Sequence, residues 1–208
     1  MSFWPLVSQF GESTYLLPAA LLTALWLCHR GQTSSALRWL AGVAVAAGIT
    51  LVSKLAFFGW GVGIAPLDFI GVSGHSAMSA TILPVLLYLC APPSRPWMAR
   101  LGAACGVGLA LLIGCSRLVL DAHSPSEVVA GLVLGLVVSL TFLSSPDGKA
   151  LPRSIVPLAA ALAIFTALHT LPMPTGASHA AHRLVVSMAT FLSGREQPYH
   201  RGFLNRQL

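Results

Sequence analysis

The sequence predicts an all-α fold, a polytopic membrane helix bundle with about six transmembrane helices. Hydrophobic residues make up 55% of the 208-residue chain and charged residues only 9%, whereas a soluble domain has about 25% charged residues. The mean hydropathy is high, at +0.78. The apolar residues fall into six runs separated by polar or Gly- and Pro-rich breaks. Because a helix needs about 20 apolar residues to cross a bilayer, these runs leave no room for a large soluble domain.

Each run predicts one helix. In chain order the helices are expected over residues 15–28, 36–58, 75–91, 97–115, 124–143 and 151–171. Three breaks between them are ordinary connectors, but two are long and unusual: "GWGVGIAPLDFIGVSG" and "SRLVLDAHSPS". We expect residues 1–175 to form a single transmembrane domain whose motif core is 54–135, and residues 176–208 to form a basic tail.

Basic residues predict the orientation of the bundle. With six spans, the first, third and fifth connectors share one side and carry Arg30, Arg38, Arg95, Arg100, Lys149 and Arg153. Short loops rich in Lys and Arg stay in the cytoplasm, so this side is expected to be cytoplasmic. The two long breaks and both termini then face the opposite side. The short connectors favour a bacterial inner membrane, in which that side is the periplasm.

The tail contains an amphipathic stretch, "AAHRLVVSMATFL". One face of a helix formed by it carries Leu184, Val185, Met188, Phe191 and Leu192. Such a helix is suited to lie along the membrane interface and contact membrane lipids. A frayed extension of the chain is the alternative. The last ten residues, 199–208, are expected to be disordered.

The formal net charge of +6 does not indicate a nucleic-acid-binding protein. The twelve Lys and Arg residues are scattered singly between apolar runs and form no basic stripe. Cysteine chemistry is not indicated either. The four cysteines, all in or beside apolar runs without C-x-x-C spacing, are Cys28, Cys90, Cys105 and Cys115. We expect them to be small core residues rather than parts of a disulfide or a metal site.

Ionisable side chains in or beside membrane spans are costly, which makes each of them a candidate for function. These residues are Lys54, Asp68, His75, Arg117, Asp121, His123, Glu127 and His169. All except His169 lie in or beside the two long breaks, on the same predicted side. The candidates therefore point to one site at one end of the bundle.

His123 and Glu127 are four residues apart at the start of a predicted helix and so share one face. The carboxylate can accept a hydrogen bond from one ring nitrogen, which leaves the other nitrogen free as a base or nucleophile. Two alternatives remain. Glu127 can simply stabilise the first helical turn, or the two residues can ligate zinc, although no second histidine pair at ligand spacing lies nearby.

Two cations suit a phosphate ligand at this site. Arg117 comes six residues before His123, in the loop that approaches the next helix, and its guanidinium offers forked donors to phosphate oxygens. Lys54 supplies a second positive charge from the far end of the preceding span. The alternative for Lys54 is a snorkelling side chain that marks the membrane edge.

The segment Ser73-Gly74-His75 opens the third predicted span with polar residues. Ser73 is a plausible N-cap, Gly74 lets a ligand approach the backbone, and the free N–H groups at a helix start bind anions. His75 could hold a proton where a departing alkoxide needs one. Taken alone, the segment is explained equally well by helix capping.

Together these segments resemble the type 2 phosphatidic acid phosphatase superfamily, membrane enzymes that remove phosphate from lipid phosphates and pyrophosphates. That family carries Lys-x6-Arg-Pro, then Pro-Ser-Gly-His, then Ser-Arg-x5-His-x3-Asp. The second motif appears here as Val72-Ser73-Gly74-His75. The third appears, with its spacing kept, as Ser116-Arg117, His123 and Glu127.

The resemblance implies a metal-independent lipid phosphatase that needs no cofactor and forms a phosphohistidine intermediate. It makes His123 the nucleophile, His75 the acid–base residue and Glu127 the group that orients His123. The residues that it assigns to phosphate binding are Arg117, Lys54, Ser73 and Gly74.

Three departures from the family pattern accompany the resemblance. Glu127 replaces the usual Asp, and Val72 replaces the usual Pro. In the first motif, the positions of the Arg-Pro pair after Lys54 hold Gly61 and Val62. Loss of one phosphate donor could lower turnover by about 10²- to 10³-fold if nothing substitutes for it.

Other functions remain open. A lipid phosphotransferase would use the same residues. The missing Arg-Pro pair also leaves open a lipid-phosphate transporter or binding protein that has lost catalysis. A vanadium-dependent haloperoxidase shares the site, but those enzymes are soluble. The lipid could be undecaprenyl pyrophosphate, phosphatidylglycerol phosphate, phosphatidic acid or a lipid A phosphate, since all of them present the same phosphoryl group.

Overall fold

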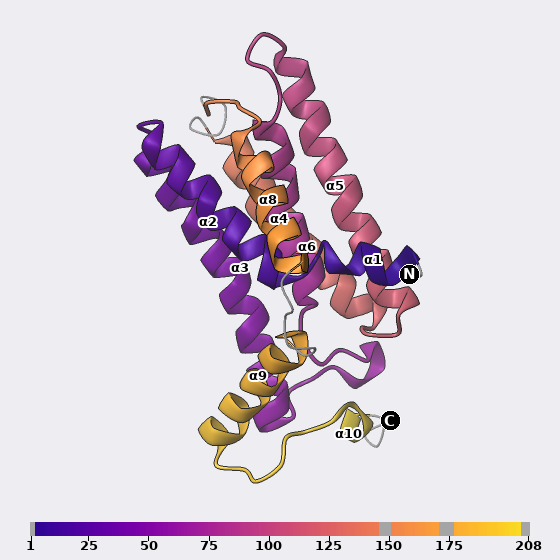
Figure 1. Cartoon of the computed structure of the whole chain (residues 1–208). Coiled ribbons are helices and arrows are strands. Elements are labelled where there is room, and N and C mark those ends of the chain that lie inside the picture. The colour runs from indigo at the N-terminus through magenta and orange to yellow at the C-terminus, as the bar shows by residue number, and fades with distance from the viewer. Residues whose placement is uncertain (1–2, 146–150, 171–176, 205–208) are drawn as a thin grey trace.

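The structure, a computed structural model, describes residues 3–145, 151–170 and 177–204, and these residues form an all-α bundle without a β-strand (Figure 1). The elements are α1 Phe3–Gln9, α2 Ser13–His29, α3 Thr33–Trp60, the short 3-10 helix η1 Ala65–Leu67, α4 Gly74–Leu89, α5 Pro96–Val119, α6 Pro125–Ser144, α8 Val156–Thr170, α9 Ala177–Ser193 and α10 Arg201–Leu204. The predicted fold class is confirmed. The predicted domain boundary, between residues 175 and 176, lies outside the described residues.

Six helices correspond to the predicted spans. Within the described residues, α3, α5 and α6 are long and apolar enough to cross a membrane. The helices α2, α4 and α8 are shorter, with 17, 16 and 15 residues. Most boundaries lie within a few residues of the prediction. The start of α8 differs most, because this helix begins at Val156 rather than at residue 151. The helix α5 also continues past residue 115 to Val119, which places Arg117 in its last turn rather than in a loop.

The central helix is α4, most of whose residues are buried. Two neighbouring helices approach it through glycines spaced four residues apart. On α5, a Cβ at Gly102 would lie 2.3 Å from the carbonyl oxygen of Leu87. On α6, a Cβ at Gly131 would lie 2.7 Å from the Ser73 carbonyl oxygen, and one at Gly135 only 2.4 Å from that of Ala77. Small residues let membrane helices pack backbone to backbone, so these glycines fix how α6 lies against the start of α4.

We expect Gly135→Ala to destabilise the protein, because its new Cβ would collide with the backbone of α4. Overpacking of this kind costs about 1–3 kcal/mol, which should lower the thermal unfolding midpoint in detergent by several degrees. Gly108→Ala is the matched control, since a Cβ there meets no atom within 4 Å. Equal unfolding temperatures for the two variants would contradict the close packing of α4 and α6.

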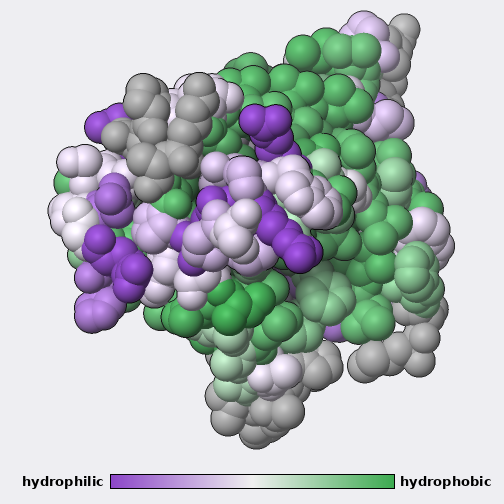
Figure 2. All heavy atoms as spheres, turned by 90° about the horizontal axis from the view of Figure 1, so that it is seen from above, coloured by the Kyte–Doolittle hydropathy of each residue, from purple (hydrophilic) through white to green (hydrophobic). Residues whose placement is uncertain are grey.

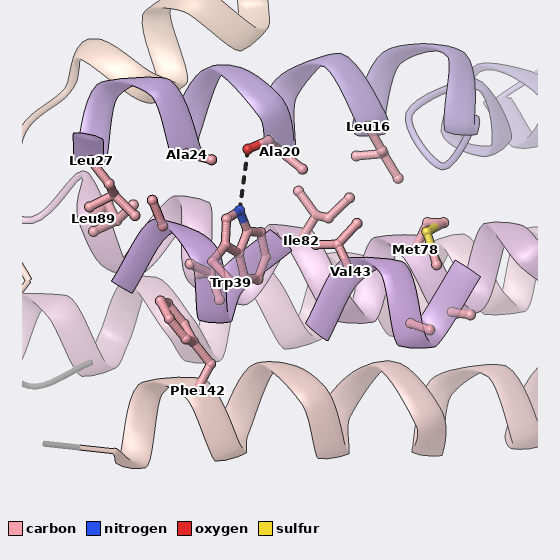
Figure 3. Packing of buried hydrophobic residues seen from close by; sticks show 14 of the residues in the cluster. Leu16, Ala20, Ala24, Leu27, Trp39, Val43, Met78, Ile82, Leu89 and Phe142 are labelled. Atoms are coloured by element: carbon pink, nitrogen blue, oxygen red, sulfur yellow. Dashed lines mark hydrogen bonds between the residues drawn. The ribbon is translucent and has the colours of Figure 1, made fainter. Parts of the chain in front are cut away.

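Buried apolar side chains fill the space between α2, α3, α4 and α6 (Figure 3). Trp39 on α3 lies at the centre of this cluster, and its indole N–H donates to the carbonyl oxygen of Ala20 on α2 at 3.3 Å. The Trp39 ring also packs against Phe142 of α6, with ring centroids 5.4 Å apart. This cluster holds α2 and α3 against the α4–α6 pair.

The first, third and fifth connectors lie at the same end of the bundle, as predicted (Figure 1). Two hydrogen bonds hold the fifth connector at this end: Ser154 N–H donates to Leu89 O, at the end of α4, at 2.7 Å, and Arg153 donates to Pro93 O, in the third connector, at 2.8 Å. Figure 2 looks at this end and shows hydrophilic side chains gathered over it, with hydrophobic side chains on the flanks. Lys149 lies outside the described residues.

The cysteines and the tail correct two expectations. All four cysteines are free, but Cys28, Cys105 and Cys115 are exposed on helix surfaces rather than in the core. Residues 199–204 are ordered against the bundle and include α10, so the expected disorder is wrong for them. The helix α9 packs on the end of α3. The exposed side chains on its outer face are Leu184, Met188, Phe191 and Leu192.

Candidate functional site

The close packing of α4 and α6 brings the two long breaks together. The Ser73 N–H, at the start of α4, donates to the carbonyl oxygen of Glu127 at 3.1 Å. The Ile70 N–H, in the break before α4, donates to the Glu127 carboxylate at 3.0 Å. Ile70 and Glu127 are 57 residues apart in the chain. The sequence-predicted site residues of the two motifs are therefore neighbours.

His123 and Glu127 form the hydrogen bond that their spacing predicts, with 2.6 Å between Nδ1 and Oε2. Glu127 also closes a capping box at the start of α6: Ser124 N–H donates to Oε2 at 3.3 Å, and Ser124 Oγ accepts from the Glu127 N–H at 3.4 Å. The helix-stabilising role and the role of holding His123 thus coexist in one side chain. An ionised carboxylate only accepts hydrogen bonds, so Nδ1 carries the proton and the lone pair of Nε2 is available.

The Glu127 side chain is wholly buried, and both of its oxygens are hydrogen bonded. In addition to the contacts of Oε2, its Oε1 accepts from the Ile70 N–H and from a guanidinium nitrogen of Arg201, the latter at 2.9 Å. Burial of a carboxylate is tolerated only when it is paired and hydrogen bonded in this way. The carboxylate is consequently held in one orientation, with Oε2 directed at His123.

His123 is half-buried in the loop between α5 and α6. This burial lowers the pKa of His123 below its ordinary value, and the charges of Lys54 and Arg117 act in the same direction, whereas the hydrogen bond to Glu127 raises it. An ordinary histidine has a pKa of about 6.5. The His123 ring is therefore neutral at pH 7, which is the state in which a histidine is nucleophilic.

Lys54, Gly74 and His75 line a cavity of about 170 Å³ together with Glu12. A Cβ at Gly74 would lie 3.9 Å from Lys54 Nζ, so the absent side chain leaves space between the start of α4 and the ammonium group. The first N–H groups of a helix have no partner within it and favour an anion. The charges of Arg117, His123 and Lys54 all act on the His75 ring. The cavity thus combines free donors with positive charge.

Arg117 lies in the last turn of α5, where one guanidinium nitrogen donates to Ser8 Oγ of α1 at 2.5 Å. Its Nε is buried and makes no hydrogen bond with any residue that the structure describes. Glu12, just before α2, acts on Arg117 through its charge. Burial raises the pKa of Glu12, and the positive charge of Arg117 opposes that rise. Arg117 is thus held in place by Ser8, while its buried Nε–H has no partner among the described residues.

Ser73 is the N-cap residue of α4, but its side chain makes no capping hydrogen bond. Its Oγ is fully buried and accepts from Ser76 Oγ at 3.1 Å. What Ser73 contributes is its backbone N–H, which links α4 to Glu127. The predicted part of Ser73 in phosphate binding remains a prediction.

The two predicted histidines line different cavities. His123 borders a space of about 520 Å³ with Asp68, Asp121 and Arg201, whereas His75 borders the smaller cavity of Lys54 and Gly74; the charge of His123 nevertheless acts on His75. The remaining candidate, His169, has a side chain outside the described residues. Within the described ranges, no group of three or more His, Cys, Asp and Glu side chains could hold a metal ion.

Sequence reasoning missed Ser8, Glu12 and Arg201. Glu12 is one of only six acidic residues in the chain, so its position beside an apolar run was a usable signal. Ser8 and Arg201 reach the site from 109 and 74 residues away in the chain. No local pattern indicates such contacts.

Two comparisons with known proteins identify the family of the chain. A family model described as the PAP2 superfamily matches residues 35–149. The chain is also 37% identical, over 98% of both chains, to a protein of Klebsiella pneumoniae named "Uncharacterized 22.5 kDa protein in cps region". No solved structure matches the chain. Since the matched region covers more than half of the chain and contains both motif segments, the protein belongs to the PAP2 superfamily, a family of phosphatase type.

Proposed function

We propose that this protein hydrolyses a phosphomonoester or pyrophosphate of a membrane lipid through a phosphohistidine intermediate. The observation that carries the proposal is the 2.6 Å contact between His123 Nδ1 and the buried Glu127 carboxylate. This contact leaves Nε2 as the nucleophile. Lys54, Arg117 and the start of α4 place positive charge and free N–H donors around the same segments.

The reaction has two steps. In the first, His123 Nε2 attacks phosphorus, the bond from phosphorus to the leaving oxygen breaks, and His75 gives that oxygen a proton. In the second, His75 takes a proton from water while the water oxygen attacks phosphorus and the P–N bond breaks, which releases phosphate and restores His123. Most of the acceleration comes from positioning and electrostatic stabilisation, as is general for phosphoryl transfer.

A bound phosphoryl group would also offset the positive charges of Arg117 and Lys54. In the structure, the positive charges of Arg117 and Lys54 act on His75. The negative charge of a phosphate between these groups would offset them and favour the protonated ring that donates to the leaving oxygen. Substrate binding and protonation of His75 are thus expected to be coupled.

The substrate is proposed to be a lipid because the site lies at one end of an apolar bundle. The end with the basic connectors is assigned to the cytoplasm, so the site would face the periplasm of a bacterial inner membrane. The relative from Klebsiella pneumoniae is bacterial, in agreement with this location. The exposed apolar face of α9, which includes Leu184 and Phe191, would contact membrane lipids.

An activity panel tests the proposal. The protein, purified in detergent, is incubated with EDTA and, in separate reactions, with undecaprenyl pyrophosphate, phosphatidylglycerol phosphate, phosphatidic acid and a lipid A phosphate. We expect inorganic phosphate from at least one lipid at a rate that EDTA does not reduce. Inhibition by EDTA would favour the zinc alternative instead.

Other outcomes of the panel separate the remaining functions. Transfer of phosphate to an added acceptor lipid, without release to water, would identify a phosphotransferase. Saturable binding of a lipid without release or transfer would identify a transporter or binding protein. Either result would overturn the hydrolase proposal.

A further inference from the structure

The C-terminal segment occupies the place where the first family motif is incomplete. A Cβ at Gly61 would lie 3.1 Å from the rings of Tyr199 and Phe203, and one at Gly63 would lie 3.1 Å from Leu204. The Tyr199 N–H donates to the carbonyl oxygen of Phe58, at the end of α3, at 3.0 Å. Gly61, which stands where the family has Arg, thus leaves room for residues 199–204. A side chain there would press on the Tyr199 and Phe203 rings.

The packing of residues 199–204 against the loop after α3 brings Arg201 to the site, although the first-motif arginine of the family is absent. Arg201, the first residue of α10, donates through Nη2 to Glu127 Oε1 at 2.9 Å. Through Nη1 it donates to the carbonyl oxygen of Asp68 at 2.8 Å and pairs with the Asp68 carboxylate. Arg201 therefore joins the loop after α3 to the buried carboxylate that holds His123.

We propose that Arg201 is a positioning residue for the His123–Glu127 pair, supplied by the C-terminal segment. A guanidinium forms a rigid planar fork that binds carboxylates with fixed geometry. Arg201 and Ile70 together occupy Oε1 of Glu127, which keeps Oε2 on His123 Nδ1. The inference rests on the proposed function, because positioning matters only if His123 is the nucleophile.

The alternative is that Arg201 only anchors the tail. The two roles differ in what they do to the ring of His123. The titratable and charged groups near this ring are Glu127, Lys54, Arg117 and His75, together with the residues Asp68, Asp121 and Arg201, which line the same space. Removing the positive charge of Arg201 leaves Glu127 less compensated, which favours protonated His123. A shift in the titration of His123 therefore reports that Arg201 is coupled to the His123–Glu127 pair, and the effect on kcat reports whether its guanidinium also orients that pair.

Arg201→Gln is the test, with Arg195→Gln as matched control. Arg195 belongs to the same C-terminal segment, but its guanidinium lies 4.2 Å over the Tyr199 ring and contacts neither carboxylate. For Arg201→Gln we expect kcat to fall by about 10- to 100-fold, with KM changed little. Removing the hydrogen-bond partner that orients a metal-binding side chain has effects of this size in metalloenzymes. We also expect the acidic limb of the pH profile to move to higher pH. Arg195→Gln should keep the wild-type profile.

A second readout does not depend on turnover. The pH dependence of His123 modification by diethyl pyrocarbonate, followed by mass spectrometry of its peptide, reports the protonation of His123 directly. If the wild type releases no phosphate but Arg201→Gln still shifts this titration upward, the proposed function fails and the Arg201–Glu127 coupling stands. An unshifted titration in Arg201→Gln overturns the positioning role, whether or not activity is lost.

Arg201→Lys decides the matter if Arg201→Gln does not fold. A lysine ammonium keeps the positive charge but lacks the planar fork that binds both carboxylates. A positioning role predicts that kcat per folded molecule falls below that of the wild type, with KM unchanged. Wild-type kcat for Arg201→Lys would show that Arg201 only anchors the tail.

Discussion

Replacing His123 with alanine is expected to lower phosphate release by at least about 10⁴-fold, since loss of a nucleophile or its base has effects of this size in other hydrolases. The ring of His123 is the group held by Glu127, and its Nε2 forms the bond to phosphorus in the proposed reaction. The cations around the site remain in the variant, so substrate binding should persist. The measurement is phosphate release from the best substrate of the lipid panel, in detergent.

The same variant should stay folded. Glu127 loses one hydrogen bond but keeps those from Ile70, Ser124 and Arg201, and one lost hydrogen bond costs about 1 kcal/mol. His29→Ala is the matched control, because His29 is exposed at the end of α2, among the basic connectors. Wild-type turnover by His123→Ala would refute the phosphohistidine scheme. A wild-type rate for His29→Ala is needed to attribute the loss to the site.

The sequence was sufficient to predict those features that depend on local pattern. Hydropathy located the six main helices of the bundle, because a span must be apolar over its whole length. The spacing of His123 and Glu127 predicted their contact because residues four apart share a helix face. The end of α5 was misplaced because its last turn contains Ser116 and Arg117. Polar residues there serve the site, and hydropathy alone does not distinguish them from a loop.

The sequence also contains a pattern that is informative about how the helices pack. Glycines four residues apart occur at Gly102 and Gly106 on α5 and at Gly131 and Gly135 on α6. All four face the backbone or Cβ atoms of α4. This spacing is typical of close helix packing in membranes. It could have predicted that α4 lies between α5 and α6.

The tail could not be predicted in the same way. Residues 199–204 form no continuous apolar run and show no helical periodicity, but tertiary contacts determine their structure. Tyr199 and Phe203 pack where Gly61 has no side chain, and Leu204 is buried beside Gly63. Such contacts depend on the three-dimensional proximity of distant segments, which a single sequence does not reveal. For the same reason, the sequence shows that the Arg-Pro pair of the first motif is absent, but not that Arg201 reaches the site from the C-terminal segment.

Glu127→Gln is expected to lower kcat by about 10³- to 10⁴-fold, in line with the amide substitution of the carboxylate in a serine hydrolase triad. The carboxylate accepts hydrogen bonds from His123, Ser124, Ile70 and Arg201, whereas a glutamine offers one acceptor oxygen and an NH₂ group that must face some of these donors. If the NH₂ group faces His123, Nδ1 becomes the acceptor and Nε2 carries the proton, so the nucleophile is lost. The measurement is kcat on the best substrate of the panel.

Two further readouts separate this loss from simple misfolding. The hydrogen bond to Glu127 raises the pKa of His123, so its removal should move the titration of His123 to lower pH, opposite to the shift expected for Arg201→Gln. Glu127→Asp is the matched control: it keeps the charge and restores the residue of the family motif, so it should retain more activity than Glu127→Gln. Turnover of Glu127→Gln within threefold of the wild type would mean that the Glu127 carboxylate serves α6 alone. In that case the neutral His123 ring would have to be oriented by burial and by the cations around it.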